Sequence, residues 1–293
     1  MKKVLVLKVI FLGIVFFMWA ENLKAQTKPY MWVDRQKSIE RRNSYRLKHD
    51  LMSQYSGVDQ TDSIYYPDFF EMIKDFKSKL GARYQYLRVY IAVYPQGGPN
   101  VPLGWERKLT LIFAPVDADC KDIPGYYYTI PPDRPFGEVV KLDDAMMKRW
   151  INLYITQLMG SITSTIDDIP DNHIGSQISD TRSITYPASN ITEIANEKDR
   201  DTHTRNGKPE RITGIKVFFA AYTGKGNEAH SNKYPKRLHL DFEFTNAAGE
   251  IIYLDDDSED QFATIPHIGT LLPFCGGTKG INNGQLCPAN CPQ

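Results

Sequence analysis

Three ionisable side chains, those of His239, Asp241 and Glu243, alternate with apolar residues along a predicted strand over Arg237 to Phe244. Successive residues of a strand point to opposite faces of a sheet, so the three share one face. A row of this kind can ligate a metal ion or act as acid and base on a substrate. The alternative is an ordinary strand with its apolar face in the core and this polar face in water.

A second group of ionisable residues follows the predicted strand Glu250 to Leu254. It holds five carboxylates within six residues, those of Asp255, Asp256, Asp257, Glu259 and Asp260. Crowded carboxylate oxygens suit calcium, although the glycine and glutamate positions of an EF-hand loop are not matched here. A calcium site that stabilises an adhesion module and a solvated acidic turn are the two hypotheses for this segment.

Four cysteines, Cys120, Cys275, Cys287 and Cys291, complete the reactive residues. Disulfides persist in exported proteins, so one bridge within the tail and one to Cys120 would tie the tail to the first half of the chain. The spacing lacks the Cys-x2-Cys pairs typical of zinc sites, but zinc bound together with His267 is an alternative, as are unpaired thiols.

Familiar enzyme motifs are missing from the sequence, among them Gly-x-Ser-x-Gly, His-Glu-x-x-His and the phosphate and dinucleotide loops. The sequence therefore favours a non-enzymatic binding or structural module, with no cofactor other than the candidate calcium. A secreted hydrolase of polysaccharide or cell-wall material is the alternative, because glycoside hydrolysis needs only two suitably separated carboxylates. Its candidate residues are His239, Asp241 and Glu243.

The elements that must position these residues occur twice along the chain. Three segments recur in the same order: Ser63–Pro67 as Ser183–Pro187, Leu87–Tyr94 as Ile215–Tyr222, and Lys108–Phe113 as Arg237–Phe242. The offsets are 120, 128 and 129 residues, which leaves room for one insertion within Asn196 to Arg211. The pattern predicts an α+β fold with an internal duplication of a helix-plus-antiparallel-hairpin unit.

Helices are predicted in three places. Phe69, Ile73, Phe76 and Leu80 recur at helical spacing, and Gly81 follows as the C-cap. Met31 to Tyr55 is charged and free of proline, and Leu142 to Met159 carries an apolar stripe.

The two hairpin connections, Tyr94 to Trp105 and Tyr222 to Tyr234, are the predicted contact surface, since loops on a rigid scaffold carry much of recognition. The rings of Tyr94, Trp105, Tyr222 and Tyr234 would stack on a glycan or on an envelope protein.

The chain begins with a charged segment and a short apolar run, which predicts a secretory signal peptide over 1–26, with an uncleaved anchor as the alternative. We then divide it into a first unit (27–140), a helix and linker (141–182), a second unit (183–272) and a tail (273–293). With 35 basic and 35 acidic residues the protein lacks the basic excess of nucleic-acid binders. We expect a periplasmic, surface or secreted protein without a transmembrane segment once the signal is removed.

Ile215–Tyr222, Arg237–Phe242 and the tail Asn283–Pro292 resemble a group of uncharacterised exported proteins of flavobacteria and related Bacteroidota. Those proteins carry a Lys-Val-Tyr-Phe-Ala-x-Tyr-like strand and a Gly-x-Leu-Cys-Pro-Pro-x-Cys-like tail, from which this chain departs at Ala289. The resemblance implies a place in the cell envelope and brings no activity with it.

Overall fold

A computed structural model shows an α+β protein in which antiparallel sheets combine with few helices, as the sequence predicts. The structure describes residues 32–34, 38–47, 58–59, 61–98, 100–131, 140–159, 182–189, 191, 203–205, 208–210, 212–221, 238–251 and 261–263. The predicted signal peptide and the tail lie outside these ranges. None of the helices in the described ranges has the length and apolar character that crossing a bilayer requires.

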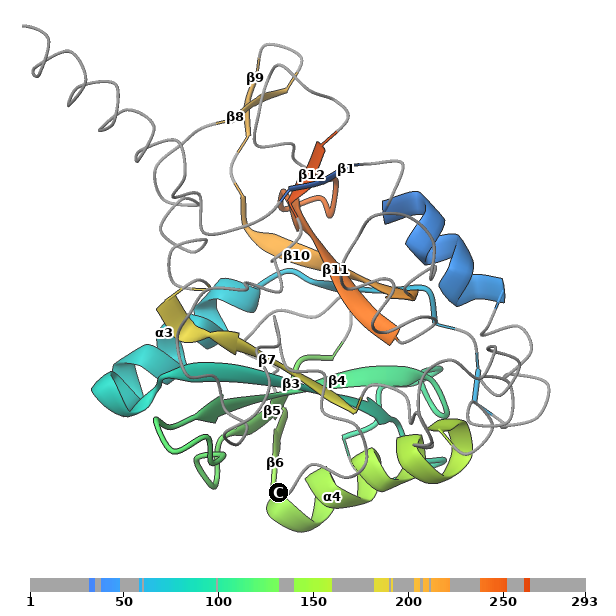
Figure 1. Cartoon of the computed structure of the whole chain (residues 1–293), viewed down its shortest axis with the longest axis vertical. Coiled ribbons are helices and arrows are strands. Elements are labelled where there is room, and N and C mark those ends of the chain that lie inside the picture. The colour runs from blue at the N-terminus through green and yellow to red at the C-terminus, as the bar shows by residue number, and fades with distance from the viewer. Residues whose placement is uncertain are drawn as a thin grey trace, which may run out of the picture.

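Two sheets form the body of the molecule (Figure 1). The five-stranded sheet has the order β6 (Val140–Leu142), β5 (Tyr127–Thr129), β4 (Leu109–Val116), β3 (Tyr86–Val93), β7 (Ser183–Pro187). The three-stranded sheet has the order β11 (Leu238–Thr245), β10 (Gly214–Ala221), β2 (Ser63–Tyr66). Two short pairs accompany them, β1 (Trp32–Asp34) with β12 (Gln261–Ala263) and β8 (His203–Arg205) with β9 (Lys208–Glu210).

The main core lies between the inner faces of the two sheets and α3 (Phe69–Leu80). Phe113 of β4 meets Tyr66 of β2 and Phe69 of α3 edge to face, which ties the helix and both sheets into one cluster. The helix ends at Gly81, whose φ of 53° requires a left-handed conformation that favours glycine. The predicted boundaries and C-cap of this helix are confirmed. The short 3-10 turn η1 (Gly81–Arg83) leads from it into β3.

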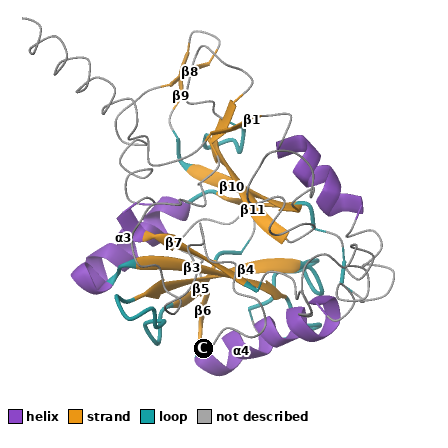
Figure 2. Ribbon diagram, in the orientation of Figure 1, coloured by secondary structure: helices purple, strands orange, loops and turns teal. Residues whose placement is uncertain are grey.

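The outer face of each of the two main sheets is covered by a helix, and both helices are among the purple helices of Figure 2, whereas α3 lies in the core between the sheets. The outer face of the five-stranded sheet is covered by α4 (Asp144–Leu153), which continues into a π-helical turn, η3 (Tyr154–Met159). Asp143 caps α4 by accepting a hydrogen bond from the Met146 amide at 2.7 Å. The predicted helix over Leu142 to Met159 is correct in place, but Leu142 belongs to β6.

The second covering helix spans residues 38–47 and lies on the outer face of β10 and β11. Of the predicted helix over Met31 to Tyr55, the described residues 38–47 are helical, whereas Trp32–Asp34 form β1. Because this helix covers β11, every residue of that strand is buried. The expectation that the polar face of the strand meets water is therefore wrong.

The first strand of each predicted copy pairs with the hairpin of the other copy. β2, from the first copy, pairs with β10 of the second, and β7, from the second copy, pairs with β3 of the first. The covering helices follow the same exchange, since helix 38–47 precedes the first copy and α4 precedes the second. The two halves of the molecule are thus interleaved along the chain.

Residues that are equivalent in the predicted repeat have equivalent partners in the two sheets. Val89 lies opposite Ile184 and Phe113, and the equivalent Val217 lies opposite Ile64 and Phe242. The turns that follow β4 and β11 are also alike. The Asp117 and Asn246 side chains accept hydrogen bonds from the amides of Lys121 and Glu250, both at 2.9 Å. An internal duplication is our interpretation of this equivalence.

Candidate functional site

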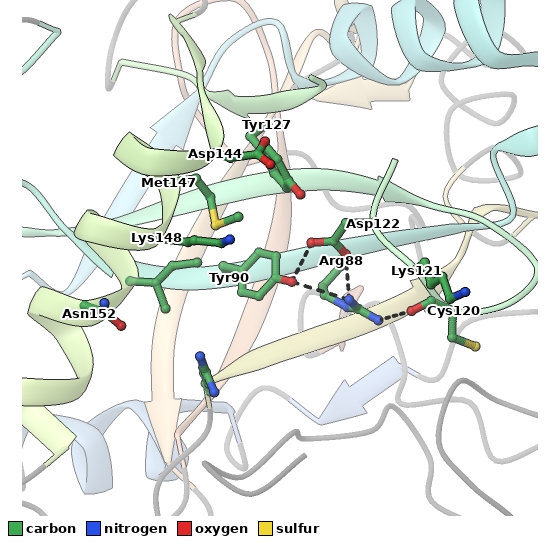
Figure 3. Close-up of a pocket in the computed structure, with 12 residues that line it drawn as sticks. Arg88, Tyr90, Cys120, Lys121, Asp122, Tyr127, Asp144, Met147, Lys148 and Asn152 are labelled. Carbon is green, nitrogen blue, oxygen red and sulfur yellow. Dashed lines mark hydrogen bonds and ion pairs between the residues drawn. The ribbon is translucent and has the colours of Figure 1, made fainter. Parts of the chain in front are cut away.

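An open cleft of about 430 Å³ lies beside α4 on the outer face of the five-stranded sheet (Figure 3). Its floor consists of buried side chains from β3, β5 and α4, namely Tyr90, Tyr127, Met147 and Ile151. The volume falls in the range of pockets that hold small molecules in proteins. An apolar floor with a polar surround is the arrangement that orients a small ligand.

The polar wall of the cleft is a network around Arg88 and Asp122, whose side chains are only 17% and 12% exposed. The Arg88 guanidinium donates to Asp122 Oδ1 at 2.6 Å and to the Cys120 carbonyl at 3.0 Å. Tyr90 donates its hydroxyl to the other oxygen of Asp122 at 2.6 Å, and Arg88 Nε donates to the Thr185 hydroxyl at 3.2 Å. The wall is therefore held together by strands β3 and β7 and the loop after β4.

The turn after β4 delivers Asp122 to this network. Cys120 occupies a left-handed conformation with φ of 67°, where the equivalent turn after β11 has Gly249 at 76°. A non-glycine residue in this region of φ is uncommon and is held there by its surroundings. In this conformation the Cys120 carbonyl points toward Arg88 and accepts a hydrogen bond from its guanidinium.

Burial shapes the ionisation of the cleft. Burial raises the pKa of the Asp122 carboxyl above its ordinary value, although Arg88 and the Tyr90 hydroxyl act in the opposite direction. Burial together with Asp122 and Asp144 raises the pKa of Tyr127 to about 12. Tyr127 therefore stays a neutral hydroxyl at physiological pH, able to donate or accept a hydrogen bond.

The rim of the cleft carries charged and polar side chains. Figure 3 shows Asp144, Lys148 and Asn152 on α4 on one side and Lys121 on the other. Arg182 completes the rim from the residue before β7, where its carbonyl accepts a hydrogen bond from the Ile91 amide at 3.1 Å. Cations outnumber carboxylates around this opening.

The predicted row of His239, Asp241 and Glu243 lies elsewhere, buried to 2%, 1% and 2% exposure beneath helix 38–47. Ser38 donates to Asp241 at 2.7 Å, Arg42 pairs with Glu243, and His239 Nδ1 lies 3.4 Å from Asp241 Oδ1. Arg42 also places its guanidinium 3.5 Å from the centre of the Phe218 ring. The row therefore fastens a helix to a sheet and lines no described cleft.

Of the predicted contact residues, Tyr94 is 1% exposed and packs edge to face against Trp150 at 5.2 Å. A ring in this position supports the core under α4 and presents no face to a ligand. Trp105 is half-buried beside it, with Lys108 Nζ 5.1 Å from its ring. Tyr222 and Tyr234 lie outside the described residues.

The remaining predicted sites fall mostly outside the described ranges. Cys275, Cys287, Cys291 and the acidic segment Asp255 to Asp260 are not described, while Cys120 is not a free thiol. Among the described residues no three His, Cys, Asp or Glu side chains are grouped to hold a metal ion. Cysteine pairing and calcium binding stay predictions.

The cleft is not evident from the sequence. Arg88 and Tyr90 stand on one face of a strand that was correctly predicted, and this pair of polar residues among apolar ones was the available signal. Asp122 is 34 positions from Arg88, and no local pattern shows that its loop folds back over that face.

We expect Tyr90→Phe to destabilise the protein by about 2 kcal/mol near neutral pH, because a hydrogen bond to a charged group is lost. The folded-state pKa of Asp122 lies above 3.8, so the stabilisation tied to its protonated form is complete below that pH and is lost as the pH rises. Loss of the Tyr90 donor raises this pKa further, so the variant loses more stability on the way to neutral pH.

Urea unfolding of the wild type and of Tyr90→Phe, below pH 3.8 and at neutral pH, measures this difference. Tyr127→Phe is the matched control. It removes a hydroxyl group from the same cleft, and this hydroxyl forms no hydrogen bond with any described residue. A Tyr90→Phe effect that does not change with pH would contradict the assignment of the Tyr90 hydroxyl to the Asp122 carboxylate.

Comparison of the chain with protein-family models, with curated proteins and with solved structures gave no match.

Proposed function

We propose that this protein is a non-enzymatic binding module of the cell envelope that takes a small polar ligand in the cleft between α4 and the five-stranded sheet. The observation that carries the proposal is the cleft itself: an open volume of about 430 Å³ with a rigid polar wall and an apolar floor. Export rests on the predicted signal peptide at 1–26, and an envelope glycan or its fragments is the ligand that such a location favours.

The internal hydrogen bonds of the wall support binding over catalysis. Both oxygens of Asp122 accept hydrogen bonds, from Arg88 and from Tyr90, and the Arg88 guanidinium has four acceptors. Groups held in this way are rigid and present a fixed surface, and a fixed surface lowers the entropic cost of ordering the site on binding.

The hydrolase alternative loses its candidate residues. His239, Asp241 and Glu243 are covered by helix 38–47, with Ser38 and Arg42 already bound to the two carboxylates. A substrate would reach them only if that helix left the sheet.

The proposal predicts that Asn152→Trp, which places a large side chain at the mouth of the cleft, lowers ligand affinity at least about tenfold, equal to 1.4 kcal/mol. Asn152 is exposed on α4, so the change should leave folding intact. The measurement is isothermal titration calorimetry of the full chain with glucose, N-acetylglucosamine, glucuronate and glucose 6-phosphate.

Arg149→Trp is the matched control, because it introduces the same side chain at an exposed position of the same helix that does not line the cleft. Equal affinities in the two tryptophan variants would contradict binding in the cleft. Absence of heat and of any shift in melting temperature with all four sugars would contradict the proposed function.

A further inference from the structure

We propose that the ligand of this cleft is a small anion, a carboxylate or phosphate group carried on a sugar-like, hydroxylated frame. The inference rests on the proposed function and names the chemical class that the cleft recognises. It is carried by the charges of the rim and by a comparison of the two halves of the molecule.

The positive charges at the rim are not neutralised within the described structure. Arg88 is paired with Asp122, which leaves Lys121, Lys148 and Arg182 against the single carboxylate of Asp144. None of these four side chains forms an ion pair with another described residue. An anionic group placed between these three cations would neutralise the excess positive charge of the rim. Its hydrogen bonds to them would be charge-assisted, and such bonds are about twice as strong as neutral ones.

Arg182 is the most informative of the three. Its Nε is buried and meets no hydrogen-bond acceptor among the described residues, and its backbone is fixed through the Ile91 amide. A buried donor without an acceptor costs free energy, so an acceptor at this place is a strong requirement. Since Arg182 lines the cleft, a ligand oxygen there would meet that requirement.

In the other half of the molecule, the charge at the equivalent position is paired within the chain. Asp62 precedes β2 as Arg182 precedes β7, and its carbonyl accepts from the Phe219 amide at 3.0 Å, as that of Arg182 accepts from Ile91. There the covering helix supplies the counter-charge, with Arg46 Nε 3.2 Å from the Asp62 carboxylate. In the cleft half, the covering helix α4 supplies Lys148, a charge of the same sign as Arg182.

The remaining polar groups of the cleft can form hydrogen bonds with hydroxyl groups of a ligand. Asp144, Asn152 and the neutral phenol of Tyr127 offer acceptors and donors on the side of α4 and β5. A ligand with an anionic group toward Arg182 and hydroxyls toward Tyr127 and Asp144 would use both sets. A bare anion would use only the first.

The experiment titrates the full chain by calorimetry with glucuronate, glucose 6-phosphate, glucose and inorganic phosphate at low and high salt. We expect at least one of the two anionic sugars to bind more tightly than both glucose and phosphate, and salt to weaken that binding. Binding of glucuronate alone would show that the preferred anionic group is a carboxylate. Binding of glucose 6-phosphate alone would show that it is a phosphate ester.

Lys148→Gln and Arg182→Gln should each weaken binding of the preferred anionic sugar about tenfold. Arg182→Lys, which keeps the charge but lacks the Nε donor, should weaken it less than Arg182→Gln. Lys77→Gln, an exposed lysine on α3, is the matched control and should change nothing. If glucose binds as tightly as the anionic sugars, the cleft does not select an anionic group, and the proposed binding function still stands. If inorganic phosphate binds as tightly, the cleft does not recognise the sugar frame. If none of these compounds binds, both proposals are wrong.

Discussion

Arg42→Met is expected to lower the free energy of unfolding by about 3 to 5 kcal/mol, because it removes the arginine that pairs with two buried carboxylates. Asp241 and Glu243 are 1% exposed at the side chain, while Arg42 is 15% exposed and reaches both of them from helix 38–47. Burial raises the pKa of Glu243, and Arg42 opposes that rise. Removal of Arg42 therefore makes ionisation of Glu243 still less favourable in the folded protein.

Urea unfolding at neutral pH measures the effect. Arg46→Met on the same helix is the control, since its ion pair with Asp62 is exposed and should contribute about 1 kcal/mol or less. Adding Glu243→Gln to Arg42→Met should recover part of the stability, because it removes one of the two buried carboxylates that lose their contact with Arg42. Equal effects of the two arginine variants, or no recovery in the double variant, would contradict the role of Arg42.

Gly214→Ala is expected to cost about 3 kcal/mol, at the upper end for an overpacked site. A methyl group at Gly214 would lie 2.4 Å from the Tyr66 carbonyl oxygen and 2.6 Å from that of Pro67. Both are backbone atoms at the end of β2, so the clash is relieved only if β10 and β2 separate. Glycine is therefore required where these strands from opposite ends of the chain meet.

The control for this prediction is Gly97→Ala, measured by the same urea unfolding. Gly97 has a φ of 69° and open space around it, so alanine there meets backbone strain of about 1 kcal/mol without a clash. A cost at Gly214 no greater than that at Gly97 would contradict the close approach of the two strands.

A disulfide test examines the exchange of the first strands directly. Tyr65 lies opposite Lys216 in β2 and β10, and residues directly opposite in antiparallel strands are close enough to be bridged by cysteines. We expect Tyr65→Cys with Lys216→Cys to form that bridge on oxidation, as mapped by mass spectrometry. Thr185→Cys with Lys216→Cys should not, because Thr185 lies opposite Arg88. The reverse result would show that the strands are not exchanged.

The polar row of β11 belongs to the second copy of the predicted repeat. The structure assigns this row to a buried contact with helix 38–47, and it places the described cleft in the half that contains β3 and β4. The corresponding residues of β4 carry no charge: Thr110 is buried with its hydroxyl 3.3 Å from that of Thr129, and Ile112 belongs to the apolar cluster under α4.

Local pattern alone determined most of the elements. The spacing of Phe69, Ile73, Phe76 and Leu80 and the following Gly81 were enough to predict α3, since they fix an apolar face and a C-cap. The strands β3, β10 and β11 followed from β-branched and alternating residues, to within a few positions. These features are local, so no knowledge of distant segments was needed.

Only the tertiary structure decided which strands pair and which faces are covered. Ser63–Tyr66 and Ser183–Tyr186 are nearly the same sequence, so either can pair with β3 or β10 by local preference alone. Likewise the alternation of β11 predicts that its two faces differ, but burial of the polar one depends on Arg42, 201 residues away. The cleft also depends on distant residues, because Arg88, Asp122 and Arg182 become neighbours only when the loop after β4 and strand β7 are in place.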